Sequence, residues 1–349
     1  MLDYLLHSGM LARAHLVRDD LVLTLSRSRS RSWLVVCDER TGLFCKQAMD
    51  WDGARTLENE WIVLRALSDL VPAIAPSPRS YDPEAGVLVV DAVVRSRTLA
   101  EHFARTRRIS LRLTGSARRA LVQLHKLTPR RLDPDSAAQI ATDAAWPLAM
   151  HHVDIDAFTT YSAATIQLLG ILQGQPAVCN ALDQAAARWE PRSLLHGDLK
   201  WDNIVVVPHG RGRATGRLTL IDWEFARFGP PEWDFASLVA EYFRWWAASV
   251  DSPSALAAGE AHVDCGFPLG AMQPSAATLL RDSPGEALDL GLVMQFSAAR
   301  LLQRAVEEAQ HLPRVTQHLL LQVQLACNVL LDPTAALELV GAAPRRAAA

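Results

Sequence analysis

The strongest constraint on the fold is the sequence LLHGDLKWDNIVVV at residues 194–207, in which polar side chains precede an apolar run. Asn203 follows Asp198 by five positions, and Asp222 follows Asn203 by nineteen positions, at the end of the apolar run LTLI. Both apolar runs are short and β-prone, so they predict two neighbouring strands. We therefore expect the side chains of Asn203 and Asp222 to come from the ends of these strands.

This arrangement of oxygen-bearing side chains suits phosphoryl transfer. That reaction requires little covalent chemistry from the protein, so the site has to position a hydroxyl group and neutralise phosphate charge. Asp198 fits the carboxylate that orients the acceptor hydroxyl. Mg²⁺ prefers hard oxygen ligands, and Asn203 and Asp222 each offer one. The spacing therefore predicts a Mg²⁺-dependent site for phosphoryl transfer.

The order of predicted elements indicates a small, mostly β part followed by a larger helical part with a short β insert. Expected strands cover residues 21–25, 33–38, 43–47, 77–82 and 86–94, and a helix with apolar residues at helical spacing covers 54–67. The first three strands read as an antiparallel meander. Later helices are expected over 156–172, 178–189, 232–249, 285–310 and 314–331, with Ser116 as the N-cap of another. The β insert covers 193–207 and 217–222.

Composition excludes several other classes of protein. A net charge of −3 gives no general attraction to nucleic acid or to a membrane surface. The five cysteines are scattered and form no CxxC pair, which argues against a disulfide framework and a zinc site. The N-terminus does not read as a signal peptide, and the apolar run near 319–331 is interrupted by polar residues. We expect a cytoplasmic protein that binds neither nucleic acid nor a membrane.

The motif HGDLKWDN followed by IDWE resembles the aminoglycoside phosphotransferase and choline-kinase branch of the protein-kinase-like superfamily. Protein kinases carry H-R-D-x-x-x-x-N and D-F-G at these places; here Gly197 replaces the arginine, and Trp223 and Glu224 replace the Phe-Gly pair. The resemblance implies an α+β, bilobal fold that uses ATP and Mg²⁺. Its expected parts are a nucleotide-binding lobe (1–92), a C-terminal helical lobe (93–349), a catalytic loop within it (194–236) and a helical substrate-binding extension (237–340).

The resemblance also assigns residues to the nucleotide. It implies that Lys46, on the third expected strand, contacts the α- and β-phosphates and pairs with a glutamate of the following helix. We assign that glutamate as Glu60 and keep Glu58 as the competitor. Asp91 and Val93 fall where the hinge of the family would bind the adenine through the backbone.

The sequence SRSRSRSW, residues 26–33, takes the place of the glycine-rich loop of kinases but contains no glycine. We expect Ser28, Arg29 and Ser30 to contact phosphate oxygens through hydroxyl and guanidinium groups. The alternative is that the arginines face solvent. Lys200, two residues after Asp198, is expected to reach the γ-phosphate, with a solvated loop lysine as the alternative.

The segment after Asp222 indicates an enzyme without regulation by an activation loop. Eleven residues separate Asp222 from Asp234, too few for such a loop, and no A-P-E motif follows. We interpret Asp234 as a structural brace of the catalytic loop.

The acceptor is left open by the sequence. The hypothesis that we favour is that the acceptor is Ser or Thr of a ribosomal precursor peptide. The first expected strands and Lys200 loosely resemble those of stand-alone kinases from thioamitide and class V lanthipeptide pathways. In such a pathway a partner lyase would then remove the phosphate. The alternatives are a small-molecule kinase acting on an aminoglycoside, choline or a homoserine-type alcohol, and an inactive pseudokinase scaffold. Tyr242, Trp245 and Trp246 could contribute an aromatic cage for choline.

Overall fold

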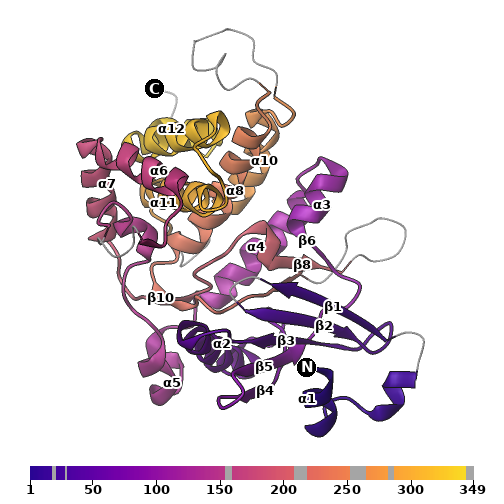
Figure 1. The fold of residues 1–349 in the computed structure, drawn as a ribbon. Coiled ribbons are helices and arrows are strands. Elements are labelled where there is room, and N and C mark those ends of the chain that lie inside the picture. Colours follow the sequence, from indigo (N-terminus) through magenta and orange to yellow (C-terminus); the bar gives the residue numbers. More distant parts are fainter. Residues whose placement is uncertain are drawn as a thin grey trace. The chain divides into compact units, whose positions relative to one another are not determined.

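An antiparallel sheet with the order β1-β2-β3-β5-β4 forms the N-terminal part of the chain (Figure 1). Its strands are β1 (Val22–Arg27), β2 (Arg31–Val36), β3 (Gly42–Gln47), β4 (Pro78–Asp82) and β5 (Val87–Asp91). These bounds confirm the expected strands and the predicted α+β class. The computed structural model describes residues 1–17, 21–27, 30–153, 159–207, 218–251, 265–281 and 287–342.

The two faces of this sheet carry different side chains because neighbouring residues of a strand point to opposite sides. Val35, Cys45 and Val89 are buried on one face, in a core shared with Leu5 of helix α1 (Leu2–His7). On the other face Ser32 is paired directly with Lys46, and Leu34 with Phe44. The polar residues needed for the site therefore lie on the face away from α1.

Helix α2 (Trp51–Leu70) packs against strands β3, β4 and β5 (Figure 1). It begins where the side chain of Asp50 accepts a hydrogen bond from Gly53 N, a standard N-cap. Its buried face carries Leu57, Val63, Leu64 and Leu67 together with Glu60. The apolar residues account for the docking of the helix, and they leave one carboxylate buried among them.

The chain divides into two compact units. The first comprises residues 1–105, 127–141 and 201–227, so it extends beyond the expected lobe at 1–92 and includes the end of the HGDLKWDN motif. It adds a three-stranded sheet with the order β6-β8-β9. The added elements are β6 (Arg97–Thr98), β8 (Ile204–Val206), β9 (Leu218–Leu220), α3 (Leu99–Thr106), α5 (Pro134–Gln139) and the 3-10 helices η1 (Arg13–Val17), η2 (Pro129–Arg131) and η5 (Trp201–Asn203).

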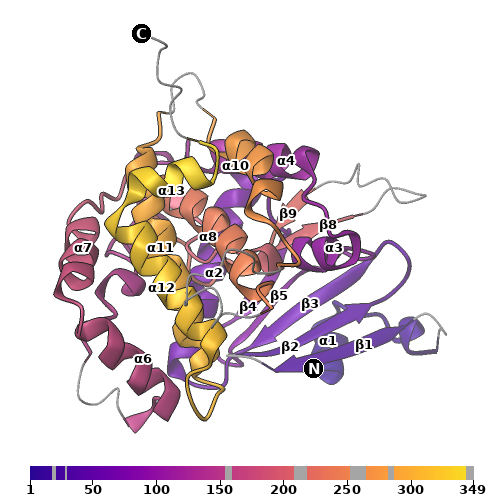
Figure 2. The same ribbon diagram turned by 90° about the horizontal axis from the view of Figure 1, so that it is seen from above.

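The second unit comprises residues 106–126, 142–200 and 228–349, and is mainly helical. Helix α11 (Leu290–Ala309) is buried along most of its length and packs against α8 (Glu232–Ala248) and α12 (Gln317–Leu331) (Figure 2). Its other elements are α4 (Leu111–Leu124), α6 (Ala163–Gln173), α7 (Pro176–Ala186), α10 (Gln273–Leu279), α13 (Pro333–Leu339), η3 (Trp146–Ala149), η6 (Leu269–Ala271), β7 (Ser193–Leu195) and β10 (Arg227–Gly229).

Three expected helix starts are wrong. Ser110, not Ser116, caps α4, and the hydroxyl of Ser116 donates to Arg112 O inside the helix. Ser162 caps α6, so that helix begins later than residue 156. Asp289 caps α11, which begins later than residue 285. Residues 154–158 and 282–286 lie outside the described part of the chain.

Among the described residues, no single helix is long and apolar enough to cross a membrane. Helices α12 and α13 reach the length and apolar composition of a membrane span only when they are taken together, and the chain bends by 114° between them. None of the five cysteines, all within the described residues, forms a disulfide bond.

Candidate active site

Lys46 is the centre of a buried ion cluster in the first unit. Its Nζ donates to Glu60 Oε2 at 2.6 Å and to Asp222 Oδ1 at 2.5 Å. Lys46 is 6% exposed and Glu60 is 3% exposed. Residues from a strand, a helix and a loop thus meet at one ammonium group. Glu58, the competing glutamate, is exposed to solvent.

The ammonium group of Lys46 stays charged in spite of its burial. Burial alone would lower the pKa of Lys46, but the carboxylates of Asp222 and Glu60 raise it above its ordinary value. A buried cation held by two carboxylates is suited to binding a polyanion, because phosphate oxygens can replace a carboxylate as the negative partner of the ammonium group.

Helix α2 also holds the backbone that follows Asp222. Glu60 Oε1 accepts a hydrogen bond from Trp223 N at 3.2 Å. The side-chain amide of Asn59 donates to Glu224 O at 3.1 Å and to Ala226 O at 3.0 Å. The sequence analysis missed Asn59; the only signal was its position next to Glu60. Two consecutive residues of α2 therefore fix the Lys46–Asp222 contact and the chain beyond it.

Asn203 and Asp222 lie at the ends of two paired strands, as the sequence predicts. Ile221 N donates to Asn203 O at 2.9 Å, which extends the β8–β9 ladder to Ile221, next to Asp222. Asp222 has a φ of 70°, in the left-handed region that a residue with a side chain adopts at a cost. The amide oxygen of Asn203 and the carboxylate of Asp222 are the hard oxygen donors that Mg²⁺ prefers, so this donor set fits the ion.

A cavity of ≈ 390 Å³ in the first unit joins these groups. Lys46, Glu60, Asn203 and Asp222 line it, and so do the hinge residues Asp91 and Val93 predicted from the sequence. Its apolar lining consists of Leu34, Phe44, Leu64, Pro76, Val90, Ala92, Val205 and Ile221. An apolar pocket with a few convergent polar groups is typical of a small-molecule site.

Of the residues predicted from the serine–arginine run, the structure places one in this cavity. Ser30 is buried, lines the cavity, and lies 3.2 Å from Ser32 between their hydroxyl oxygens. Arg31 is exposed. Ser28 and Arg29 lie outside the described residues, so their expected phosphate contacts stay predictions.

The hinge segment is held by its own hydrogen bonds. Asp91 N donates to Ser77 O at 2.9 Å, and the carboxylate of Asp91 accepts from Arg79 Nε at 2.6 Å. The hydroxyl of Ser96 donates to Val93 O at 2.6 Å. These contacts fix the backbone at one end of the cavity, where the adenine is expected.

In the second unit, Asp198 is buried and bound by two cations. Arg300 Nη2 donates to its Oδ1 at 2.8 Å and Lys200 Nζ donates to its Oδ2 at 2.9 Å. Lys200, expected at the γ-phosphate, is therefore paired with Asp198 in this structure. Burial would raise the pKa of Asp198, but the guanidinium of Arg300 and the ammonium of Lys200 hold it well below its usual range. This carboxylate is thus ionised, held by two cations, and a weak base.

Arg300 is another residue of the candidate site that sequence reasoning missed. It lies on α11, is 3% exposed, and its guanidinium covers the ring of Trp233 at 5.7 Å. Its Nη1 donates to Gln303 Oε1 at 2.5 Å. The signal was an arginine inside an apolar helix, in the sequence SAARLLQRAV. Arginine is almost never fully buried without a partner. An arginine within a buried apolar helix therefore indicates a carboxylate close to it in the fold.

Asp234 braces the turn before Asp198. Its carboxylate accepts from His196 N at 2.9 Å, Gly197 N at 3.2 Å and His125 Nε2 at 3.1 Å. Gly197 has a φ of 80°, a conformation that glycine adopts without strain and that an arginine would adopt at a cost. Burial would raise the pKa of Asp234, but these hydrogen bonds hold it below its ordinary value. His125 was not foreseen from the sequence.

Two of the three aromatic residues considered for a choline cage, Tyr242 and Trp245, have other surroundings. Tyr242 is buried, and its hydroxyl oxygen lies 2.6 Å from that of Ser275. The guanidinium of Arg244 covers the ring of Trp245 at 5.3 Å. Tyr242 therefore belongs to the core, and the ring of Trp245 is already covered by the guanidinium of Arg244.

Comparison with known proteins agrees with this geometry. The family described as APH, the phosphotransferase enzyme family, matches residues 21–274. No curated protein matches the chain.

Several solved structures share the fold at low sequence identity. The choline kinase LicA from Streptococcus pneumoniae is 15% identical with a TM-score of 0.53, covering 94% of this chain and 98% of its own. A choline/ethanolamine kinase family protein from Mesorhizobium loti is 15% identical with a TM-score of 0.53, covering 98% and 99%. A microcompartment-associated aminopropanol kinase is 17% identical with a TM-score of 0.54, covering 96% and 98%. At such identities the likeness shows the fold alone.

Proposed function

The chain belongs to the phosphotransferase enzyme family and acts on hydroxyl acceptors, and from this premise we propose that it transfers the γ-phosphate of ATP in a Mg²⁺-dependent reaction. The observation that carries the proposal is the Lys46–Glu60–Asp222 cluster, which lines the same cavity as Asn203. These are the groups that phosphoryl transfer needs around the phosphates of a nucleotide.

Each part of the cavity then has a role. Lys46 binds the α- and β-phosphates, while Glu60 keeps its ammonium group in place. Asn203 and Asp222 would hold Mg²⁺, which when bound neutralises charge on the β- and γ-phosphates. The apolar lining and the backbone near Asp91 and Val93 receive the adenine.

Asp198 orients the acceptor hydroxyl. Both of its oxygens already accept hydrogen bonds from Arg300 and Lys200, so its position is fixed before the acceptor binds. In a loose transition state the hydroxyl proton leaves late, and a carboxylate with a low pKa is then adequate for positioning it.

The charges around Asp198 favour a neutral or anionic acceptor. Each carboxylate of the surrounding network is paired with a base: Asp198 with Arg300 and Lys200, Glu241 with Arg244, and Glu307 with Arg304. A polycationic aminoglycoside would have to displace these arginines, of which Arg300 is buried and Arg244 and Arg304 are partly exposed. Together with the surroundings of Tyr242 and Trp245, this leads us to propose an acceptor without a net positive charge.

Two acceptors have this chemistry, and we carry both as proposals. One is a Ser or Thr side chain of a peptide, which Lys200 favours because it pairs with Asp198 from the position that a lysine takes in protein Ser/Thr kinases. A separate lyase that eliminates the phosphate would then be the partner. The other is a small carboxylated alcohol of the homoserine type.

A cytoplasmic location stays a prediction.

The experiment is an acceptor panel with the full chain, ATP and Mg²⁺, in which phosphorylated products are detected by mass spectrometry. The panel holds a Ser/Thr-rich peptide, homoserine, choline and kanamycin, each with wild type, Asp198→Asn and Asp202→Asn. Asp202 is an exposed neighbour and serves as the matched control. We expect product from the peptide or homoserine with wild type and Asp202→Asn only. Preferred turnover of kanamycin or choline would overturn the acceptor class, and no product with any hydroxyl would favour a scaffold.

A further inference from the structure

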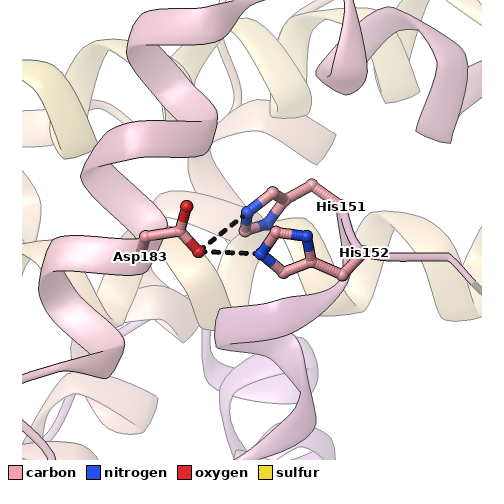
Figure 3. A group of neighbouring side chains, drawn as sticks. All are labelled: His151, His152 and Asp183. Carbon is pink, nitrogen blue, oxygen red and sulfur yellow. Dashed lines mark hydrogen bonds and ion pairs between the residues drawn. The ribbon is translucent and has the colours of Figure 1, made fainter.

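A second group of polar side chains lies in the second unit, on elements that the proposed reaction does not use. His151 and His152 follow η3, and Asp183 lies on α7. Figure 3 shows both imidazole rings turned towards the carboxylate of Asp183. The Nε2 atoms of His151 and His152 lie 3.0 Å and 2.9 Å from the same oxygen, Asp183 Oδ1. One ligand atom from each residue lies within 4.8 Å of the others.

We propose that these three residues form a binding site for a divalent transition-metal ion such as Zn²⁺. Neutral imidazole nitrogen and carboxylate oxygen are common ligands of this ion, at about 2.0–2.2 Å. Ligand atoms at such distances from one ion lie roughly 3.0–3.5 Å from one another in tetrahedral geometry. The distances from the two Nε2 atoms to Asp183 Oδ1 therefore have to increase by only a few tenths of an ångström.

The scaffold fixes the ligands before an ion binds. His151 is 6% exposed, and its carbonyl oxygen accepts a hydrogen bond from the side-chain amide of Gln173 on α6 at 2.9 Å. The Nδ1 atom of His151 is buried without a hydrogen-bond partner among the described residues, so Nε2 is the nitrogen that faces another polar group. Asp183 lies within a helix that packs against η3.

An ion can also enter from solvent. The side chains of His152 and Asp183 are 63% and 50% exposed. Because only three protein ligands converge, at least one position is left for water. Cys179, one turn before Asp183 on α7, donates its thiol to Leu172 O at 3.4 Å, so the described donor set has two nitrogens and one oxygen. This set favours Zn²⁺ or its neighbours over Mg²⁺, which prefers oxygen alone.

The test uses the full chain without an affinity tag, stripped with a chelator and titrated with Zn²⁺ by calorimetry. Co²⁺ absorption in the visible range reports the ligand geometry independently of activity. His152→Ala and Asp183→Asn remove one ligand each, and His311→Ala, another exposed histidine, is the matched control. Circular dichroism of the metal-free proteins checks that the variants fold.

We expect wild type and His311→Ala to bind a single Zn²⁺ ion, and each ligand variant to lose affinity by about tenfold or more. Zn²⁺ should also raise the melting temperature of wild type and not that of Asp183→Asn, because the ion joins η3 to α7. Absence of Zn²⁺ binding by wild type, or equal affinity in wild type and folded Asp183→Asn, would overturn the site.

Discussion

Arg300 Nη2 lies 2.8 Å from Oδ1 of Asp198, so a helix 102 residues further along the chain holds the carboxylate of the catalytic loop. Lys200 holds the other oxygen from within the loop. Helix α11 therefore contributes directly to the chemistry proposed for the HGDLKWDN motif.

Arg300→Ala should lower kcat by about 10- to 100-fold, because Asp198 loses the contact that fixes its position. Without the guanidinium, burial raises the pKa of Asp198, so the acid limb of the kcat–pH profile should move to higher pH. Arg300→Lys should restore part of both effects. A fall in kcat with an unchanged pH profile would mean that Arg300 acts on the fold alone. Arg314→Ala, at an exposed position, is the control.

Glu60→Gln should weaken the use of ATP, whereas Glu58→Gln should not. Glu60 is buried against Lys46 and Trp223 N, while Glu58 is exposed on the same helix. Loss of the carboxylate frees Lys46 from α2, and we expect KM for ATP to rise and kcat to fall. Steady-state kinetics of both variants check this. Equal kinetics of the two would show that the Lys46–Glu60 pair has no part in nucleotide binding.

The dependence on Mg²⁺ should change in Asp222→Asn and Asn203→Ala. Each removes one of the two proposed oxygen ligands, so the Mg²⁺ concentration for half-maximal rate should rise by about tenfold or more. Asp202→Asn, next to Asn203 but exposed, should behave as wild type. Identical Mg²⁺ curves for all four proteins would place the ion elsewhere.

Stability should fall in acid through Asp198 and Asp234. The pKa of each is lower in the folded protein than in the unfolded chain, where it is about 3.9. Such groups stabilise the fold above the unfolded pKa, and this contribution is lost as the pH falls from about 5 towards the lower folded pKa. Thermal melts of wild type and Asp234→Asn across this range should show a smaller pH dependence in the variant. Parallel curves would contradict the assignment.

The parts of the site that follow from local spacing were predictable, and those that depend on distant contacts were not. Lys46 lies on β3, Asn203 and Asp222 lie beside the ends of β8 and β9, and Lys46 contacts Asp222 directly. Arg300, Asn59 and His125 meet their partners only after folding, so neighbouring residues in the sequence say little about them. Arg300 in particular lies on a helix that composition alone marks as apolar core.

The helix starts show the same limit. Ser116 was expected to cap a helix because apolar residues at helical spacing follow it, but the pattern continues back to Leu113, and Ser110 makes the cap. A serine inside a helix bonds to the carbonyl of the preceding turn, as Ser116 does to Arg112. Local sequence offers two serines that can cap, and packing of the earlier turn selects between them.

The central claim is tested most directly by ATP turnover with Mg²⁺ and a hydroxyl acceptor, comparing Lys46→Met with Lys126→Met. Lys126 is exposed and serves as the matched lysine. We predict that Lys126→Met keeps the wild-type rate and that Lys46→Met loses roughly a hundredfold or more, because the phosphates lose their buried cation. Equal rates in the two variants would contradict the account.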